Sequence, residues 1–461
     1  MADTMEVLTT VDIGSHSLKG IVASFEGGQC EVLAYSRVKS RGYEQGELKD
    51  IVALRESLES LLKDLSEQLP RRMECDFTIH MVDHSITLIN EVKTISIGGT
   101  NLPVEITEDH VIRLFEKMNT LSDDTETQDS YSLVGAKRSI LHVIPRKYLL
   151  DNVKSVLNPL DMEASSLGME AAVITMDNTM KESLGNAFSA VLGQKPTVYS
   201  APFVSSEVVL NSMEKERGVV CLDLGHSFTS ISAYLNGSIF FMKTFELGFK
   251  LVIKDIAQVF HTSFDEAERL LNTFGKISLK QDSSETISYT LLDGKTSKQM
   301  SRSQLSIVIY AKIREIMNAI KREMRHISAR MSEEGEKTIA GGIVLTGGGA
   351  KLEGIQEFTR DIFKLPVRSG NPGSGNFRVN APEEPLQNPL FSGCFGSAYW
   401  YHLVGGSSDE DSFASEEHPK KKKAASKPVK EKPVKQKPGG PARKEGPTVF
   451  EKIVEFLKKL V

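Results

Sequence analysis

Apolar, β-branched runs separated by short polar turns open the chain. The runs 7–13, 18–24 and 30–40 each predict a strand. Apolar positions at helical spacing over 51–68 predict a helix, and 76–83 is the next apolar run. The order strand, strand, strand, helix, strand predicts an α/β half-domain that begins with a β-meander.

A segment near the middle of the chain repeats this order of elements. The apolar run VVCLDL, 219–224, has Asp223 as its second-to-last residue and is followed by Gly225, a polar turn and the outgoing run FTSISAY. The opening run likewise has Asp12 one residue before its end and passes through Gly14 into polar residues. DIGSHSLK and DLGHSFTS therefore predict an internal duplication at low identity.

Both turns have the composition of a phosphate site. Glycine, hydroxyl groups and free backbone N–H groups suit phosphate oxygens, and a neighbouring acidic residue can hold a metal ion through its waters. One such turn alone is equally typical of an ordinary β-hairpin. Two matched turns facing each other across a cleft can hold a phosphate chain and its metal from both sides, and the duplication favours this interpretation.

Other segments add an insertion, a basic helix and a glycine turn. Residues 84–165 do not continue the first skeleton, and we interpret them as an inserted αβ subdomain. A long helix at 303–331 carries six cations, either as a solvated basic face or as a dock for an acidic peptide. Residues 339–358 predict a strand, a turn of three successive glycines and a helix. The turn is either an ordinary tight connection between strand and helix or a surface against which a nucleotide lies. A final helix is predicted at 388–401.

Composition narrows the class of protein. The 461 residues provide for two or three domains, and a formal charge of −5 gives no overall attraction to nucleic acid. Four scattered cysteines argue against a disulfide framework or a cysteine metal site and fit a reducing cytoplasm. The sequence shows neither a signal peptide nor a run of about 18 apolar residues that could span a membrane.

The end of the chain changes in character. Residues 405–447 are acidic and then strongly basic, with almost no apolar residues, and predict a disordered linker. Its lysine block is also compatible with nuclear localisation or nucleic-acid binding. Residues 448–461 predict an amphipathic helix. This helix either docks on a protein or lies on an anionic membrane surface, and the basic linker before it favours the membrane.

Together these features resemble the FtsA family of bacterial actin-like division proteins, especially its Thermotoga-type members. The loop SRGYEQGELKD, the segments KYLLD and NPLDM and the run APFVSSEVVL add to the resemblance. It implies a two-lobed, actin-like (ribonuclease-H-like) α/β ATPase fold with an inserted αβ subdomain, a disordered linker and a C-terminal amphipathic helix. The expected boundaries are 1–83 and 166–200 for the first lobe, 84–165 for the insertion, 201–386 for the second lobe, 387–404 for a closing helix, 405–447 for the linker and 448–461 for the amphipathic helix.

The resemblance also implies ATP and Mg²⁺ between the lobes. Phosphates would lie against both turns, adenosine against the glycine turn and ribose against an acidic helix residue, while Asp12 would hold the metal through water. The implied nucleotide residues are Ser15, His16, Ser17, Lys19, Gly225, His226, Ser227, Gly248, Glu268, Gly347, Gly348 and Gly349.

Two departures from the family pattern bear on catalysis. Many relatives carry Glu-Pro where this chain has Ala201-Pro202, and an aspartate where it has Ser230. Those carboxylates are the natural groups to orient the attacking water and support the metal. We therefore expect ATP to bind while hydrolysis is weak or absent, and we assign no catalytic residue.

Partners follow from the resemblance as well. It implies filaments at the inner face of the cytoplasmic membrane, at the division site, that hold the acidic C-terminal peptide of FtsZ. We place that peptide on the basic helix, at Lys312, Arg314, Lys321, Arg322 and Arg325, and the anionic lipid on Phe450, Ile453, Phe456, Leu457 and Leu460. The alternatives are an active ATPase or sugar-kinase-type enzyme on the same fold, or a chaperone or pilus-assembly module.

Overall fold

The computed structural model describes residues 6–26, 29–70, 75–98, 102–120, 137–278, 285–333 and 339–404. Residues up to His402 form one compact unit. The linker and amphipathic helix predicted for 405–461 lie outside the described residues.

The first lobe is built on a six-stranded sheet of order β13-β6-β1-β2-β3-β21. Strands β1, β2 and β3 form an antiparallel meander, and β6 and β13 add to it in parallel. Their bounds are β1 Glu6–Ile13, β2 Ser17–Glu26, β3 Gln29–Lys39, β6 Asp76–Met81, β13 Thr197–Ser200 and β21 Val379–Asn380. The predicted strand–strand–strand–helix–strand order is confirmed.

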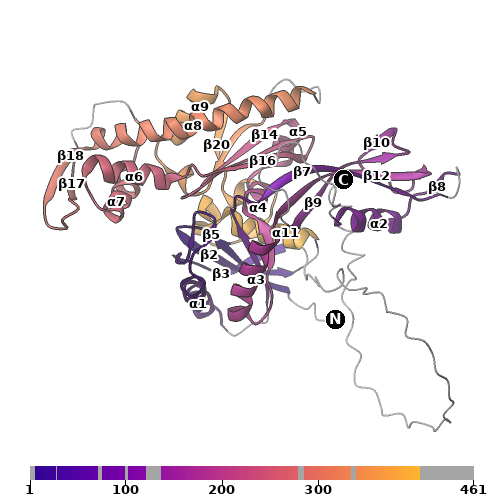
Figure 1. Cartoon of the computed structure of the whole chain (residues 1–461), viewed down its shortest axis with the longest axis horizontal. Helices are drawn as coiled ribbons and strands as arrows, with labels where there is room; N and C mark the ends of the chain where they lie inside the picture. The colour runs from indigo at the N-terminus through magenta and orange to yellow at the C-terminus, as the bar shows by residue number, and fades with distance from the viewer. Residues whose placement is uncertain are drawn as a thin grey trace, which may run out of the picture. The chain divides into compact units, whose positions relative to one another are not determined.

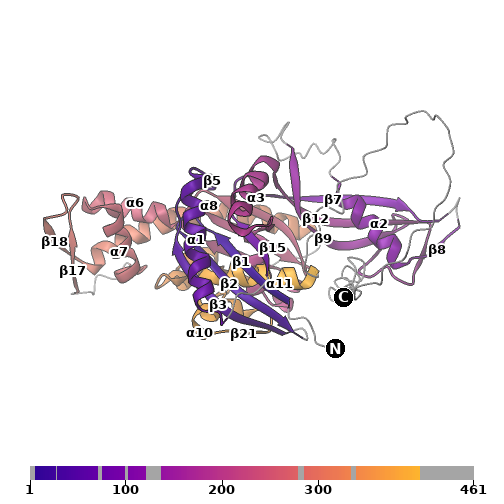
Figure 2. The ribbon, with the colours of Figure 1, turned by 90° about the horizontal axis from the view of Figure 1, so that it is seen from below.

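Helices cover both faces of this sheet. Helix α1 (Ile51–Glu67) packs on β2 and β3, where a Cβ on Gly20 would lie 3.0 Å from the Leu65 side chain (Figure 2). Thr10 faces the other way and donates to the carbonyl oxygen of Cys394 in α11 (Ser392–Val404). Gly396 of α11 lets the helix approach α4 (Ala201–Val209), because a Cβ there would lie 1.9 Å from the Val204 oxygen.

The second lobe repeats the topology of the first. Its five-stranded sheet has the order β16-β15-β14-β19-β20, again with an antiparallel meander and two parallel strands. The bounds are β14 Val219–Leu224, β15 Thr229–Leu235, β16 Ser238–Phe245, β19 Gly342–Thr346 and β20 Val367–Ser369. The internal duplication predicted from DIGSHSLK and DLGHSFTS therefore extends to five strands of each sheet, and β21 has no counterpart in the second.

Helices and a hairpin complete the second lobe (Figure 1). The long basic helix predicted at 303–331 is α8, whose buried face includes Ile309, Ile316 and Ile320. The remaining bounds are α5 Ser212–Arg217, α6 Phe249–Phe260, α7 Phe264–Phe274, β17 Thr286–Thr290, β18 Ser297–Ser301, α8 Arg302–Glu333, η1 Gly348–Lys351, α9 Ile355–Phe363, η2 Pro372–Ser374, α10 Glu383–Gln387 and η3 Pro389–Phe391.

The insertion forms its own four-stranded sheet of order β10-β9-β12-β7, with α2 lying beside it (Figure 1). Its bounds are β7 Thr87–Ser96, β8 Val104–Glu105, α2 Glu108–Met118, β9 Arg138–Leu150, β10 Lys154–Val156, β11 Glu163–Ala164 and β12 Ser166–Asp177. We expected the first lobe to resume at 166. This boundary is wrong for the strand, because β12 pairs with β7 and β9 along its length. The chain returns to the first lobe through α3 (Asn178–Leu192).

Within the described residues, no helix is both long enough and apolar enough to cross a membrane.

Candidate functional site

One cavity of about 550 Å³ lies where the two duplicated turns meet. This volume is in the range of small-molecule sites. Eleven of the twelve residues predicted for the nucleotide line it, as does Asp12: Ser15, His16, Ser17, Lys19, Gly225, His226, Ser227, Glu268, Gly347, Gly348 and Gly349. The twelfth, Gly248, does not line the cavity but supports the second turn, because a Cβ there would lie 2.2 Å from the His226 oxygen.

The two turns share one backbone geometry. A Cβ on Gly14 would lie 2.8 Å from the Ser17 oxygen, and a Cβ on Gly225 would lie 2.8 Å from the Phe228 oxygen. Both glycines are therefore needed for the same close turn. The second turn is also fixed to the start of α6, whose Lys250 N–H donates to the His226 oxygen over 2.7 Å.

Asp12 and Asp223 occupy equivalent strand positions but have different neighbours. Asp12 pairs across the meander with Lys19, whose ammonium group forms an ion pair with its carboxylate. The residue across from Asp223 is Ser230, which carries no charge. Burial and the negative charge of Asp12 raise the pKa of Asp223 to about 6. The charges of Asp12 and Asp223 therefore act on each other across the cavity.

Two buried polar atoms of cavity-lining residues have no hydrogen-bond partner among the described residues. The Ser227 hydroxyl is buried without a hydrogen bond, and so is Nε2 of His80, which lies 3.7 Å from the nearer Asp12 oxygen. Buried polar groups are normally satisfied, so an unpaired group on a cavity wall fits a polar ligand. The basic side chains Lys19, Arg37 and Lys351 on the same lining suit an anionic one.

The triple-glycine turn closes the cavity from the second lobe. Gly347 has φ +78°, and a Cβ there would lie 2.2 Å from Oδ1 of Asp223. A Cβ on Gly349 would lie 2.1 Å from the Phe249 ring. We expected a helix directly after these glycines. The turn instead continues into the short 3₁₀ helix η1, and α9 begins only at Ile355, so the α9 N-terminus is not part of the turn.

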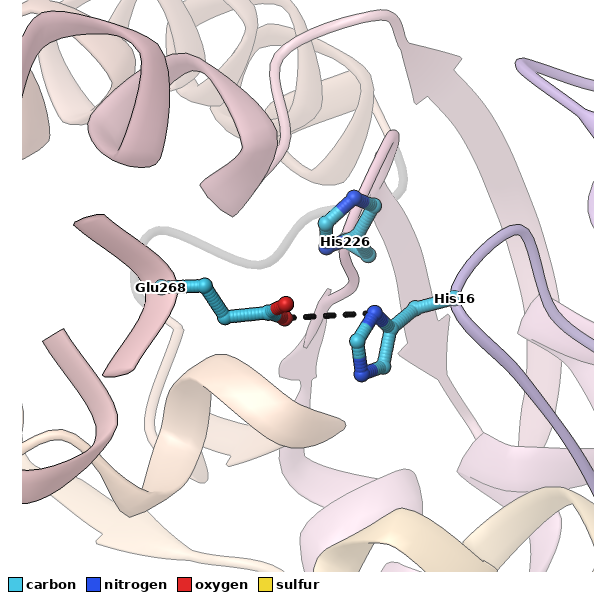
Figure 3. Close-up of side chains that lie close together, drawn as sticks. All are labelled: His16, His226 and Glu268. Carbon is cyan, nitrogen blue, oxygen red and sulfur yellow. Dashed lines mark ion pairs between the residues drawn. The ribbon is translucent and has the colours of Figure 1, made fainter. Parts of the chain in front are cut away.

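Three side chains converge from separate segments at the cavity (Figure 3): His16 from the first turn, His226 from the second and Glu268 from α7. Nδ1 of His16 lies 3.2 Å from Oε1 of Glu268. Burial lowers the pKa of His16, against the opposing charge of Glu268. Burial, with His16 and Lys250, lowers the pKa of His226 to about 4, so this imidazole is neutral near pH 7.

Sequence reasoning missed several cavity residues. Tyr43 belongs to the segment we interpreted as a surface loop, yet it is buried and its hydroxyl donates to the Val82 oxygen. That segment forms the small hairpin of β4 (Tyr43–Glu44) and β5 (Glu47–Leu48). His80 was one polar residue in an apolar strand. Arg37 and Lys351 carried no local signal.

The structure divides the basic residues proposed on α8 into two groups. Lys312 forms ion pairs with Asp255 and Glu315, and Lys321 donates to the Ile362 oxygen. Arg314, Arg322 and Arg325 are exposed and have no ion pair with any described residue. The five predicted membrane contacts, Phe450, Ile453, Phe456, Leu457 and Leu460, lie outside the described residues.

Two family models match the chain. The model described as "Cell division protein FtsA" matches residues 220–396, and that of the "SHS2 domain inserted in FTSA" matches 84–175. A cell division protein FtsA from Borreliella burgdorferi is 28% identical over 400 residues, covering 86% of this chain and 91% of the relative. The FtsA of Escherichia coli K12 is 24% identical over 416 residues, covering 88% and 93%.

Solved structures share the fold. The PilM–PilN type IV pilus biogenesis complex aligns with a TM-score of 0.55 at 15% identity, covering 85% of this chain and 98% of that chain. MreB 5 of Spiroplasma citri bound to AMPPNP aligns with a TM-score of 0.51 at 11% identity, covering 87% and 98%. At such low identity these matches indicate an actin-like fold and nothing beyond it.

Proposed function

The chain belongs to the FtsA family of cell division proteins, and from this premise we propose that it binds ATP, polymerises at the inner face of the cytoplasmic membrane and tethers the FtsZ ring there. The observation that carries the nucleotide part is the single cavity in which both duplicated turns and the triple-glycine turn meet. A clamp of this kind suits a ligand with a phosphate chain at one end and a planar group at the other.

Each turn has a distinct task in the proposed complex. The first turn, with Ser15 and Lys19, and the second, with the unpaired Ser227 hydroxyl, would hold phosphate oxygens. The bare backbone of Gly347–Gly349 would lie against adenosine, and Glu268 against ribose. Asp12 would hold Mg²⁺ through water, and the ion would neutralise phosphate charge.

Hydrolysis is proposed to be slow. Ala201 and Ser230 both line the cavity, and neither provides the carboxylate that many relatives carry at these positions. Among the described residues, the acidic side chains of the lining are Asp12, Asp223 and Glu268, each at another position of the sequence. Phosphate release at the rates typical of kinases, about 1–100 per second, would instead favour the enzyme alternative.

Calorimetric titration with Mg-ATP tests the nucleotide proposal. Because Ser227→Ala removes an unpaired hydroxyl from the cavity, we expect ATP to bind about three- to tenfold more weakly. Ser238→Ala is a matched control, since the Ser238 hydroxyl is also buried without a partner but does not line the cavity. A flat titration of the unaltered chain would contradict ATP binding.

The proposed dock for the FtsZ peptide is the exposed face of α8. Arg314, Arg322 and Arg325 lie opposite the buried face of this helix, and their guanidinium groups are free to bind carboxylates. Lys312 and Lys321 contribute less in this proposal, because both already have partners.

A fluorescent FtsZ C-terminal peptide tests this dock. Arg322→Glu with Arg325→Glu should weaken peptide binding about tenfold or more through charge repulsion. Lys154→Glu, an exposed charge reversal in the insertion, should leave it unchanged. If the double arginine variant and the Lys154→Glu variant bind the peptide equally well, the result would favour the solvated-face interpretation of α8. It would also favour the chaperone or pilus-assembly alternative.

Membrane attachment is proposed for the last fourteen residues. Phe450, Ile453, Phe456, Leu457 and Leu460 share one face of the amphipathic pattern, and lysines share the other. One short helix binds lipid weakly, so many copies in a filament would act together. Co-sedimentation with anionic vesicles should pellet the full chain and leave a chain ending at Gly405 in solution. Equal pelleting would refute the anchor.

Filament formation is testable by electron microscopy of the full chain on anionic vesicles with Mg-ATP. We expect filaments on the vesicle surface, since the anchor concentrates the chain there. A uniformly monomeric coat under saturating ATP would refute polymerisation.

A further inference from the structure

His16, His226 and Glu268 form a cluster with the donor set of a transition-metal site (Figure 3). Each residue comes from a different segment: His16 from the β1–β2 turn, His226 from the β14–β15 turn and Glu268 from α7. His16 lies more than two hundred positions before the other two in the sequence. In the family-based assignment these groups only touch a nucleotide. Their mutual arrangement allows a second role.

The distances are short enough for one ion. One ligand atom from each residue lies within 4.8 Å of the other two. His16 Nδ1 and Glu268 Oε1 are 3.2 Å apart, and the two imidazole rings have centroids 4.9 Å apart at 30°. Ligand atoms around a tetrahedral Zn²⁺ lie about 3.3 Å apart, since each bond is about 2.0–2.1 Å. The His16–Glu268 pair already has this spacing, and a ligand atom of His226 lies within 4.8 Å of both.

The ligand types select among metals. Two imidazoles and one carboxylate suit Zn²⁺ and similar ions, whereas Mg²⁺ requires oxygen ligands in an octahedron. The site is also accessible, because the side chains of His16 and Glu268 are 31% and 21% exposed. Three protein ligands leave a fourth position for water.

We propose that His16, His226 and Glu268 bind a divalent transition-metal ion of the Zn²⁺ class. The ion would connect the turn of the first lobe to the turn and the α7 helix of the second. It would therefore hold the two lobes together across the cavity without any nucleotide. This site is separate from the Mg²⁺ that the family assignment places at Asp12.

Binding of Zn²⁺ to the full chain, in the absence of nucleotide, tests the proposal directly. Calorimetry against a competing chelator should find one tight site per chain. His16→Ala and His226→Ala should each weaken it by about tenfold or more, because each removes one of three ligands. Glu268→Gln keeps the size of the side chain and should also weaken binding. His326→Ala, which removes an exposed histidine of α8, is the matched control and should change nothing.

Co²⁺ supplies an independent readout that does not depend on activity. The full chain should give the intense visible absorption of four-coordinate Co²⁺, and Zn²⁺ but not excess Mg²⁺ should abolish it. Loss of the signal in His16→Ala and His226→Ala, with unchanged circular dichroism, would support the site.

Two results would overturn the proposal. One is that the unaltered chain and the His16→Ala, His226→Ala double variant bind Zn²⁺ with equal affinity. The other is that the control His326→Ala weakens Zn²⁺ binding as much as His16→Ala or His226→Ala does. Neither depends on ATP, so failure here leaves the nucleotide proposal intact, and a flat ATP titration leaves this one intact.

Discussion

At the scale of single residues, the duplicated aspartates show how one neighbour changes the chemistry of a position. Asp12 faces Lys19 across the meander, and Asp223 faces Ser230. Burial and the charge of Asp12 outweigh the opposing charge of Lys19 and raise the pKa of Asp223 to about 6 from an ordinary value of 3.8. The folded chain therefore disfavours the ionised form of Asp223.

This raised pKa predicts a pH-dependent gain in stability for Asp223→Asn. The folded state holds the Asp223 proton more tightly than the unfolded state, so the contribution of Asp223 to the stability of the unaltered chain falls as pH rises from about 4 to about 7. The asparagine variant lacks this loss. Between pH 4 and pH 7, the free energy of unfolding of Asp223→Asn should therefore rise by about 1–3 kcal/mol relative to that of the unaltered chain.

Denaturant unfolding of the nucleotide-free chain at both pH values measures the effect. Asp361→Asn replaces an exposed aspartate and serves as the control. Identical pH responses of Asp223→Asn and the unaltered chain would contradict the assignment.

Gly347 provides a second test at this scale. An alanine there adds the strain of φ +78° and places a Cβ 2.2 Å from Oδ1 of Asp223. Gly294→Ala is a matched control, because Gly294 has φ +66° but open space around the same position. Gly347→Ala should lose more stability than Gly294→Ala, because the Gly347 backbone (φ +78°, ψ 178°) is one that residues with a Cβ rarely adopt, and only Gly347→Ala should lose ATP affinity in a calorimetric titration. Equal ATP affinity in the two would exclude a role for the Gly347–Asp223 contact.

At the scale of elements, Arg138 fixes the base of the insertion. This residue begins β9, and its guanidinium group donates to Ser85 O, to the Thr87 hydroxyl and to the Thr175 hydroxyl and carbonyl oxygen. One side chain thus joins the segment that leaves the first lobe to three strands of the inserted sheet. The insertion is held at its root by polar contacts as well as by strand pairing.

Arg138→Met should loosen this root. The change removes four hydrogen bonds to partly or fully buried acceptors, so we expect the free energy of unfolding to fall by about 2–4 kcal/mol. Hydrogen exchange should rise in β7, β9 and β12 and stay unchanged in β14 and β15. Arg113→Ala, at an exposed position of α2 in the same insertion, is the control. An equal rise in hydrogen exchange across the whole chain would contradict a local role of Arg138 at the base of the insertion.

At the scale of the whole molecule, α11 joins the two lobes. Ser397 bonds to Nδ1 of His80 over 2.8 Å in the first lobe, while Ser392 bonds to Thr346 of the second lobe over 2.8 Å. Among the described residues, those that line the cavity lie between Asp12 and Gly393. The candidate site named above therefore belongs to the described folded unit.

A chain that ends at Val404 should accordingly keep its fold and its affinity for ATP. We expect an unchanged thermal midpoint and an ATP affinity within about twofold of the full chain, because the described contacts remain. Differential scanning calorimetry and ATP titration measure both. A clear drop in either would mean that the tail packs on the folded unit, and would weaken the vesicle experiment as evidence for an anchor.

Local signals in the sequence determined much of this protein. The meanders, the two glycine turns, the triple-glycine turn and helix α8 were all predicted, because spacing of apolar residues and glycine at a close turn depend on neighbours in the chain. The resemblance to the FtsA family followed from these same local segments. The cavity lining confirms that the predicted turns come together.

Tertiary structure decided what depends on distant partners. Strand β12 is as apolar as a lobe strand, and only pairing with β7 and β9 assigned it to the insertion. Tyr43 and His80 lie at the cavity because of tertiary packing, and the apolar and polar residues next to them in the sequence do not indicate this. The meeting of His16 with Glu268 likewise joins residues from two lobes. Such contacts are non-local, so the sequence specifies them only through the complete fold.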